Sequence, residues 1–282
     1  MEDKELKALV KLLEDDDTEV VDHVEAQIRS FGTGIIPFLE EEWESQFNPI
    51  IQRRIEDLVH GLQFELVKER LIVWKEKKEP ELLEGIWILA TYQYPDLDLN
   101  ELQKQIEQLY YEAWTEVKEE MTPYDQIRML NSVMFDKLKF RANTKNFHAP
   151  ANSMINSVLE SKKGNPISLC SVYMLLAQKL NLPVYGINLP NLFILTYKTE
   201  DTQFYINVFN KGLIFSREDI DNYLQHLKLT PEDIYFEPCS NLEIIIRYLR
   251  NLIVSFEKVG DYHKSDEVKQ ILLELDDNPD VY

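Results

Sequence analysis

A cysteine and a histidine in this chain are the first candidates for covalent chemistry, because a thiol can act as a nucleophile and an imidazole as its base. Cys170 lies within residues 164–186, GNPISLCSVYMLLAQKLNLPVYG, and His148 precedes that segment. A thiolate beside a histidine base is the nucleophile–base pair of thiol hydrolases and acyl transferases. Ser168 adds a hydroxyl that could act as a nucleophile or satisfy a backbone donor in a first helical turn. The elements that position these side chains decide between such roles.

The segment around Cys170 is typical of a buried helix that leads into a strand. Asn165 is a good N-cap, and Pro166 suits the first helical position, where no backbone donor is needed. Apolar residues recur on two stripes of the helix, which predicts burial on most sides. Cys170 falls within one stripe, and burial raises a thiol's pKa and makes it inert. Two roles for Cys170 stay open: a small core residue, or a nucleophile served by His148.

The remaining sequence predicts a predominantly helical α+β protein. Short aromatic or branched runs predict strands at 184–188, 192–197 and 204–209. Asn152 or Ser153 is expected to cap a short helix before the central one. Apolar spacing predicts helices in these further regions: 3–62, 49–140 including a start at Thr122-Pro123, 217–227, 242–258 and 263–275. The first of them, with its acidic turn and Gly break, resembles a single HEAT-type repeat.

Composition excludes several classes of function. A net charge of −20 disfavours nucleic acid and anionic lipid as partners. A short basic run, Lys137 to Lys145, is either a solvated face or a docking patch for an acidic partner or for the acidic N-terminal helices. Two cysteines make no disulfide framework, and no leader or membrane span is expected, which favours a reducing cytoplasm. The five histidines lack the spacing of a zinc site, so no metal or cofactor is expected.

Three stretches together resemble a bacterial transglutaminase-like family of the Sir-B type. Residues 152–197 resemble that family's Asn-Ser helix start, its GIPI helix and its NLPGHF segment. INVFNKG at 206–212 is similar to its IDPFNGG, and residues 247–279 resemble its tetratricopeptide-like tail, with Ser265 where that repeat prefers Ala. The resemblance implies three parts: a helical domain (1–121) with the HEAT-like start, a helix-plus-antiparallel-sheet core (122–240), and a C-terminal helical hairpin (241–282).

The resemblance also implies a Cys-His-Asp triad in active relatives, and this chain departs from it at each position. The nucleophile, base and orienting positions fall on Pro166, Leu192 and Asn207. Proline has no nucleophile, leucine accepts no proton, and asparagine carries no charge to stabilise an imidazolium. We therefore expect a non-catalytic, pseudoenzyme-like protein that binds a protein or peptide through a vestigial groove and its helical surfaces.

Five further polar residues are candidates to line that groove: Asn152, Ser168, Tyr185, Asn188 and Asn191. Asn152 and Ser168 could instead be helix-capping residues. The alternative function is a cysteine-dependent hydrolase or acyl transferase that uses Cys170 with His148. A purely structural core, with the helical ends as an adaptor, is a third hypothesis.

Overall fold

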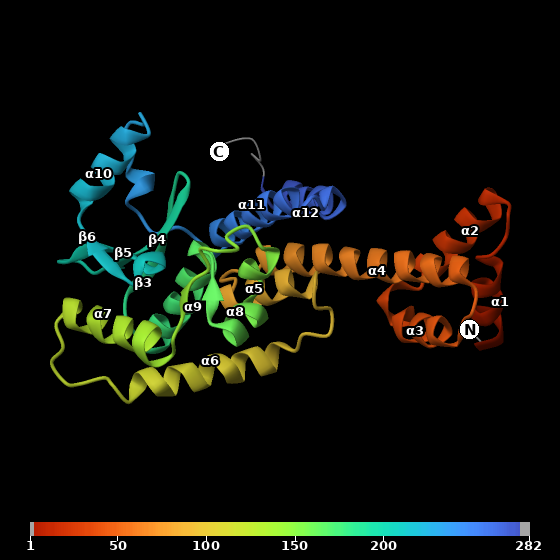
Figure 1. Cartoon of the computed structure of the whole chain (residues 1–282), viewed down its shortest axis with the longest axis horizontal. Helices are drawn as coiled ribbons and strands as arrows, with labels where there is room; N and C mark the ends of the chain where they lie inside the picture. The colour runs from red at the N-terminus through yellow and green to blue at the C-terminus, as the bar shows by residue number, and fades with distance from the viewer. Residues whose placement is uncertain (1–2, 277–282) are drawn as a thin grey trace. The chain divides into compact units, whose positions relative to one another are not determined.

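The computed structural model describes residues 3–276, and its contacts divide the chain into two compact units, Met1–Arg70 and Leu71–Tyr282 (Figure 1). Both are rich in helix, and the second also holds the sheet. The structure confirms the predicted class, a predominantly helical α+β fold. Within residues 3–276, no helix combines the length and the apolarity needed to cross a bilayer.

The first unit is built from three short helices and most of one long helix, and their apolar residues share one core. The helices are α1 (Asp3–Leu12), α2 (Thr18–Arg29), α3 (Ile36–Ser45) and most of α4 (Pro49–Lys75). Asp17, in the acidic turn, caps α2 by accepting a hydrogen bond from the Glu19 backbone N–H. Leu13, Leu39 and Leu58 are fully buried in the shared core of this unit.

The second unit places helices on both faces of a four-stranded antiparallel sheet. The strands are β3 (Val184–Leu189), β4 (Leu192–Lys198), β5 (Gln203–Asn207) and β6 (Leu213–Phe215), in that order. The helices are α5 (Leu82–Thr91), α6 (Leu99–Trp114), α7 (Pro123–Asn131), α8 (Ile155–Ser161), α9 (Pro166–Lys179), α10 (Arg217–His226), α11 (Asn241–Val259) and α12 (Tyr262–Leu275).

Strand register assigns each side chain to one face of this sheet. Ile187 lies opposite Ile194, and Leu189 lies opposite Leu192, so these four share a face. That face packs with Ile220 of α10 in an apolar cluster. The alternate residues, including Phe193, face the other way, because neighbours along a strand point to opposite sides. Helix α9 also contacts β3 and β4, but its residues do not belong to the cluster around Ile220. The α10 helix and the α9 helix therefore cover different faces.

Helix α9 is the buried centre of the second unit, as its two apolar stripes predict. Asn165 is its N-cap and Pro166 its first residue, and both predictions are confirmed. The side chains of Ile167, Leu169 and Tyr173 are fully buried. Antiparallel α11 and α12 form the predicted C-terminal hairpin, with Gly260 in the left-handed conformation at the end of α11 (Figure 1).

Three local details differ from the sequence-based expectations. Residues 208–210 form a 3₁₀ turn and not the end of a strand, and the strands Leu213–Phe215, Arg141–Ala142 (β1) and Lys163–Gly164 (β2) were not predicted. Asn152 lies in a 3₁₀ turn, and α8 begins after Met154 without a side-chain cap. The prediction that Asn152 or Ser153 caps this helix is therefore wrong, because the Asn152 side-chain amide donates its hydrogen bonds to carbonyl oxygens of the preceding loop.

Candidate functional site

The head of α9 opens onto a pocket of about 190 Å³. Its walls come from the start of α9, the turn between β3 and β4, helix α11, and the loop before residue 149. All ten lining residues are apolar, neutral polar or basic: Phe147, His148, Asn165, Pro166, Asn191, Phe193, Arg247, Asn251, Val254 and Ser255. Such a wall suits a ligand that carries hydrogen-bond acceptors or negative charge.

Asn165, one of the lining residues, is held by hydrogen bonds from its side-chain oxygen, its side-chain nitrogen and its backbone N–H. Its side-chain oxygen accepts a hydrogen bond from the Ser168 backbone N–H at 3.0 Å. Its Nδ2 donates to Ser153 Oγ at 2.8 Å, and the Asn165 backbone N–H donates to Ser168 Oγ at 3.1 Å. Ser168 is fully buried and completes a capping box. This residue supports the helix and does not open onto the pocket.

The loop wall is held in place by the buried amide of Asn152. Its Nδ2 donates to the carbonyl oxygens of Asn146 at 2.7 Å and Phe147 at 2.9 Å. Its Oδ1 accepts a hydrogen bond from Asn143 Nδ2 at 2.8 Å. The His148 ring packs edge-on against the Phe147 ring and is exposed at the pocket rim. By holding the backbone of the two residues before His148, Asn152 helps to fix the position of His148.

The third wall is a polar stripe on α11 that the sequence analysis missed. Arg247 Nη1 donates to Asn188 Oδ1 at 2.9 Å and to the Leu189 carbonyl oxygen at 3.1 Å. Asn251 and Ser255 follow at intervals of one helical turn and line the same pocket. Polar residues repeated every four positions along the helix, at 247, 251 and 255, are the sequence signal that could have found this wall.

The structure does not bring the alternative thiol site together. The Cys170 side chain is fully buried, and its Sγ lies 3.7 Å from the carbonyl oxygen of Phe193. Burial raises the pKa of the Cys170 thiol far above its ordinary value. His148, by contrast, sits at the exposed rim. Burial also raises the pKa of the second thiol, Cys239, to about 12.

Of the three positions matched to the triad, Pro166 is the one found in the pocket lining. Leu192 packs on the sheet face covered by α10, and its neighbour Phe193 takes the place in the pocket wall. Asn207 Oδ1 accepts a hydrogen bond from the Asn210 backbone N–H at 3.1 Å, which caps the 3₁₀ turn after β5.

Among the groove candidates, Asn191 alone lines the pocket. It occupies the left-handed region at φ 58° in the turn between β3 and β4, a conformation that asparagine tolerates well. Asn188 is not in the lining, but its Oδ1 accepts a hydrogen bond from Arg247, which is. Tyr185 is 39% exposed on the opposite face of β3 from Asn188.

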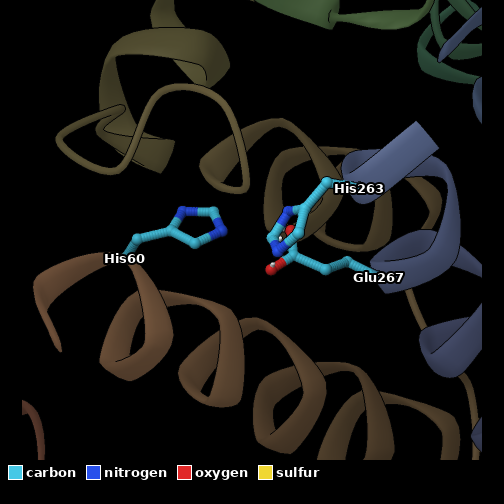
Figure 2. Close-up of side chains that lie close together, drawn as sticks. All are labelled: His60, His263 and Glu267. Atoms are coloured by element: carbon cyan, nitrogen blue, oxygen red, sulfur yellow. Dashed lines mark ion pairs between the residues drawn. The ribbon is translucent and has the colours of Figure 1, made fainter. Parts of the chain in front are cut away.

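Outside this pocket, His263 and Glu267 form a pair of potential metal ligands. They lie one turn apart on α12, with His263 Nδ1 3.8 Å from Glu267 Oε1 (Figure 2). Glu267 Oε2 also accepts a hydrogen bond from the Tyr92 hydroxyl at 2.6 Å, and burial first and this bond second raise the pKa of Tyr92. His60, also labelled there, belongs to the first unit. Glu267 is thereby explained as an acceptor that ties α12 to Tyr92.

Comparison with known proteins shows that a recognised family region includes most of the residues that line this pocket, from Phe147 to Arg247. The family model described as "Transglutaminase-like superfamily" matches residues 100–250. A UPF0162 protein of Xylella fastidiosa (strain 9a5c) is 28% identical over 201 residues, which cover 69% of this chain and 71% of that protein. A UPF0162 protein of Vibrio cholerae is 27% identical over 175 residues, covering 60% and 64%. F-box only protein 21 of Mus musculus is 32% identical over 91 residues, which cover 29% of this chain and 14% of that protein. No solved structure matches the chain significantly.

Proposed function

The chain belongs to the transglutaminase-like superfamily, and we propose that it is a non-catalytic member that binds a protein or peptide segment through the pocket at the head of α9. One observation carries the proposal. Pro166 occupies the pocket wall at the first position of α9, where the resemblance implies a nucleophile. The nearest thiol on that helix, Cys170, is fully buried one turn further along.

The alternative of a cysteine-dependent hydrolase or acyl transferase finds less support. A thiol nucleophile acts as the thiolate, and burial of Cys170 opposes its ionisation. The His148 ring is exposed, whereas the Cys170 sulfur is fully buried. The same pocket wall suits the docking of a peptide, because it combines apolar rings with polar donors.

Further features of this proposal concern the rest of the chain. We assign the finer relationship to the Sir-B type, with α11 and α12 as a tetratricopeptide-like pair that offers a helical docking surface. Ser265, fully buried in α12, supports close packing of the two helices. The HEAT-like start, the three-part division at residues 121 and 240, and a cytoplasmic location stay predictions.

The proposal is tested by filling the pocket. Val254 is 44% exposed and lines the pocket, so Val254→Trp should occupy it without disturbing the core. Leu273→Trp, at a 63% exposed position of α12 outside the lining, is the matched control. On an array of decapeptides, we expect the Val254 variant to lose most captured peptides and the Leu273 variant to keep them.

Catalysis is tested in parallel with a glutamine-bearing peptide and an amine acceptor. We expect no ammonia release above the buffer rate. Turnover that disappears in Cys170→Ala and persists in Cys239→Ala would overturn the non-catalytic assignment. Equal peptide capture by the two tryptophan variants would instead overturn the assignment of the pocket as the binding site.

A further inference from the structure

We propose that the pocket at the head of α9 receives a tyrosine side chain of the bound segment, with the phenol hydroxyl at Asn251 and Ser255 of α11; this inference rests on the proposed function. Three features of the pocket lead to it: a buried serine hydroxyl without a partner in residues 3–276, apolar walls that include aromatic rings, and a volume that fits one side chain. All of these residues belong to the second unit.

The exposure of the lining residues separates the inner end of the pocket from its mouth. Phe193, Asn165 and Ser255 are 2%, 5% and 6% exposed, so they form the inner end. Phe147 and Val254 are 42% and 44% exposed and lie at the mouth. The tip of a side chain that enters the pocket therefore meets the inner residues, away from water.

Ser255 supplies the polar group at the inner end that lacks a partner. Its hydroxyl forms no hydrogen bond to another residue of the described range 3–276. Asn165, by contrast, already uses its side-chain oxygen on the Ser168 N–H and its side-chain nitrogen on Ser153. A buried polar group without a partner is uncommon in folded proteins and is costly. A ligand that bonds to the Ser255 hydroxyl removes this cost.

Asn251 adds a second polar group one helical turn before Ser255 on the same side of α11. It is half-buried, and within the described part of the chain its amide also has no hydrogen-bond partner. A ligand hydroxyl can donate to the amide oxygen and accept from the serine hydroxyl, or bond to both in the opposite sense. Neither group carries a charge, so the pair matches a neutral hydroxyl.

The walls between the mouth and this polar pair are apolar, and two of them are aromatic. Phe147, Pro166 and Phe193 line the pocket. The Phe147 ring stands edge-on to the Phe209 ring, with the ring centroids 5.9 Å apart and the planes at 86°. An aromatic side chain gains more than its burial when another ring packs edge-on or offset against it. These walls therefore favour a ring that carries a hydroxyl over an aliphatic chain that ends in an amide.

The volume of the pocket fits one side chain. At about 190 Å³ it lies below the roughly 300–1,000 Å³ of sites for drug-sized ligands. Tyrosine combines an aromatic body with a polar tip, and its hydroxyl usually finds a hydrogen-bond partner when it is buried. Tyrosine is also among the residues that contribute most to protein interfaces. The pocket is therefore suited to hold a tyrosine anchor of the bound segment.

The experiment compares decapeptides that are identical except for Tyr, Phe or Gln at the centre, measured by fluorescence anisotropy with the full chain. We expect the Tyr peptides to bind about tenfold more tightly than the Phe peptides, because a hydrogen bond between buried groups contributes about that factor. The Gln peptides should bind more weakly than the Tyr peptides. Gln peptides that bind as tightly as the Tyr peptides, or more tightly, would overturn the choice of an aromatic side chain.

Two variants remove the partners of the ligand hydroxyl. Ser255→Ala keeps the helix, because alanine is the best helix former, and it should lower the Tyr-to-Phe ratio by at least about threefold. Ser255→Ala combined with Asn251→Ala should bring the ratio to about one. Ser132→Ala makes the same change at an exposed position outside the lining and should leave the ratio intact. An unchanged ratio in the double variant would overturn the assignment of the hydroxyl to α11.

Three further outcomes separate this inference from the proposed function. Equal binding of Tyr and Phe peptides, still lost in Val254→Trp, would overturn the hydroxyl assignment and leave peptide binding in place. If no peptide binds in a manner sensitive to Val254→Trp, the proposed function fails as well. N-acetyltyrosinamide that binds as tightly as the Tyr peptides would overturn the peptide as the source of the tyrosine side chain.

Discussion

Replacing Asn165 with alanine should loosen the head of α9 by about 3 kcal/mol. The change removes an N-cap, which costs about 0.5–2 kcal/mol. It also leaves Ser153 Oγ without the donor that lies 2.8 Å away, in a residue that is 3% exposed. A buried polar group that loses its partner costs about 1–3 kcal/mol. Because every 1.4 kcal/mol is a factor of ten, local opening of α9 should become about 100-fold more frequent.

Hydrogen exchange followed by mass spectrometry on peptides from α9 measures this opening without requiring the whole chain to unfold in one step. Asn165→Asp is the control, because a carboxylate still accepts from the Ser168 N–H and favours the positive end of the helix. It cannot donate to Ser153, but the Ser153 hydroxyl can rotate and donate to it instead, so that residue keeps a partner. We expect it to shift α9 protection by less than about 1 kcal/mol. An Asn165→Ala protein whose α9 exchange lies within about 0.5 kcal/mol of the parent, the smallest cap effect alone, would refute the reasoning.

Two further outcomes follow from burial and backbone geometry. At pH 8, iodoacetamide should leave both thiols of the native protein almost unlabelled and should label both rapidly in denaturant. The reason is that burial raises the pKa of each thiol in the folded protein. For Cys239, with a pKa of about 12, only about 10⁻⁴ of the thiol is ionised at pH 8. Rapid native labelling of Cys170 would contradict its assignment as a core residue. Gly212→Ala should destabilise the protein by more than about 2 kcal/mol, and Gly32→Ala by only about 1 kcal/mol, in urea unfolding. Both glycines have positive φ, but a Cβ at Gly212 would lie 1.9 Å from Asn131 Oδ1, whereas at Gly32 it meets nothing within 4 Å; equal losses would show that the contact with Asn131 relaxes freely.

The sequence predicts the central helix well because its signals are local. Asn165, Pro166 and the apolar stripes act within a few residues of each other, and the structure places the cap and the buried helix accordingly. The same holds for the helix start predicted at Thr122-Pro123, where Thr122 caps α7 and Pro123 is its first residue. Side-chain hydrogen bonds over three residues or fewer leave a pattern that can be read without the rest of the fold.

What the sequence does not predict depends on contacts between distant segments. β1 and β2 have two residues each, and they pair only because the fold brings 141–142 beside 163–164. Arg247 reaches the pocket across about sixty positions of chain from Asn188. Matching Leu192 to a family motif gives its place in the strand and not the face on which it lies, and a strand changes face at every residue.

The short pairing of β1 with β2 has a consequence for how this site can change over evolutionary time. The Arg141 N–H donates to the Lys162 carbonyl oxygen at 2.9 Å, and the Asn143 N–H donates to the Gly164 carbonyl oxygen at 3.0 Å. These main-chain links tie the loop before His148 to the residue next to Asn165, and at 141 and 143 any residue with a backbone N–H can form them. Substitutions of the lining residues can therefore change which ligand the pocket binds while the backbone around the pocket keeps its shape. Diverged relatives could then share the pocket and bind different ligands.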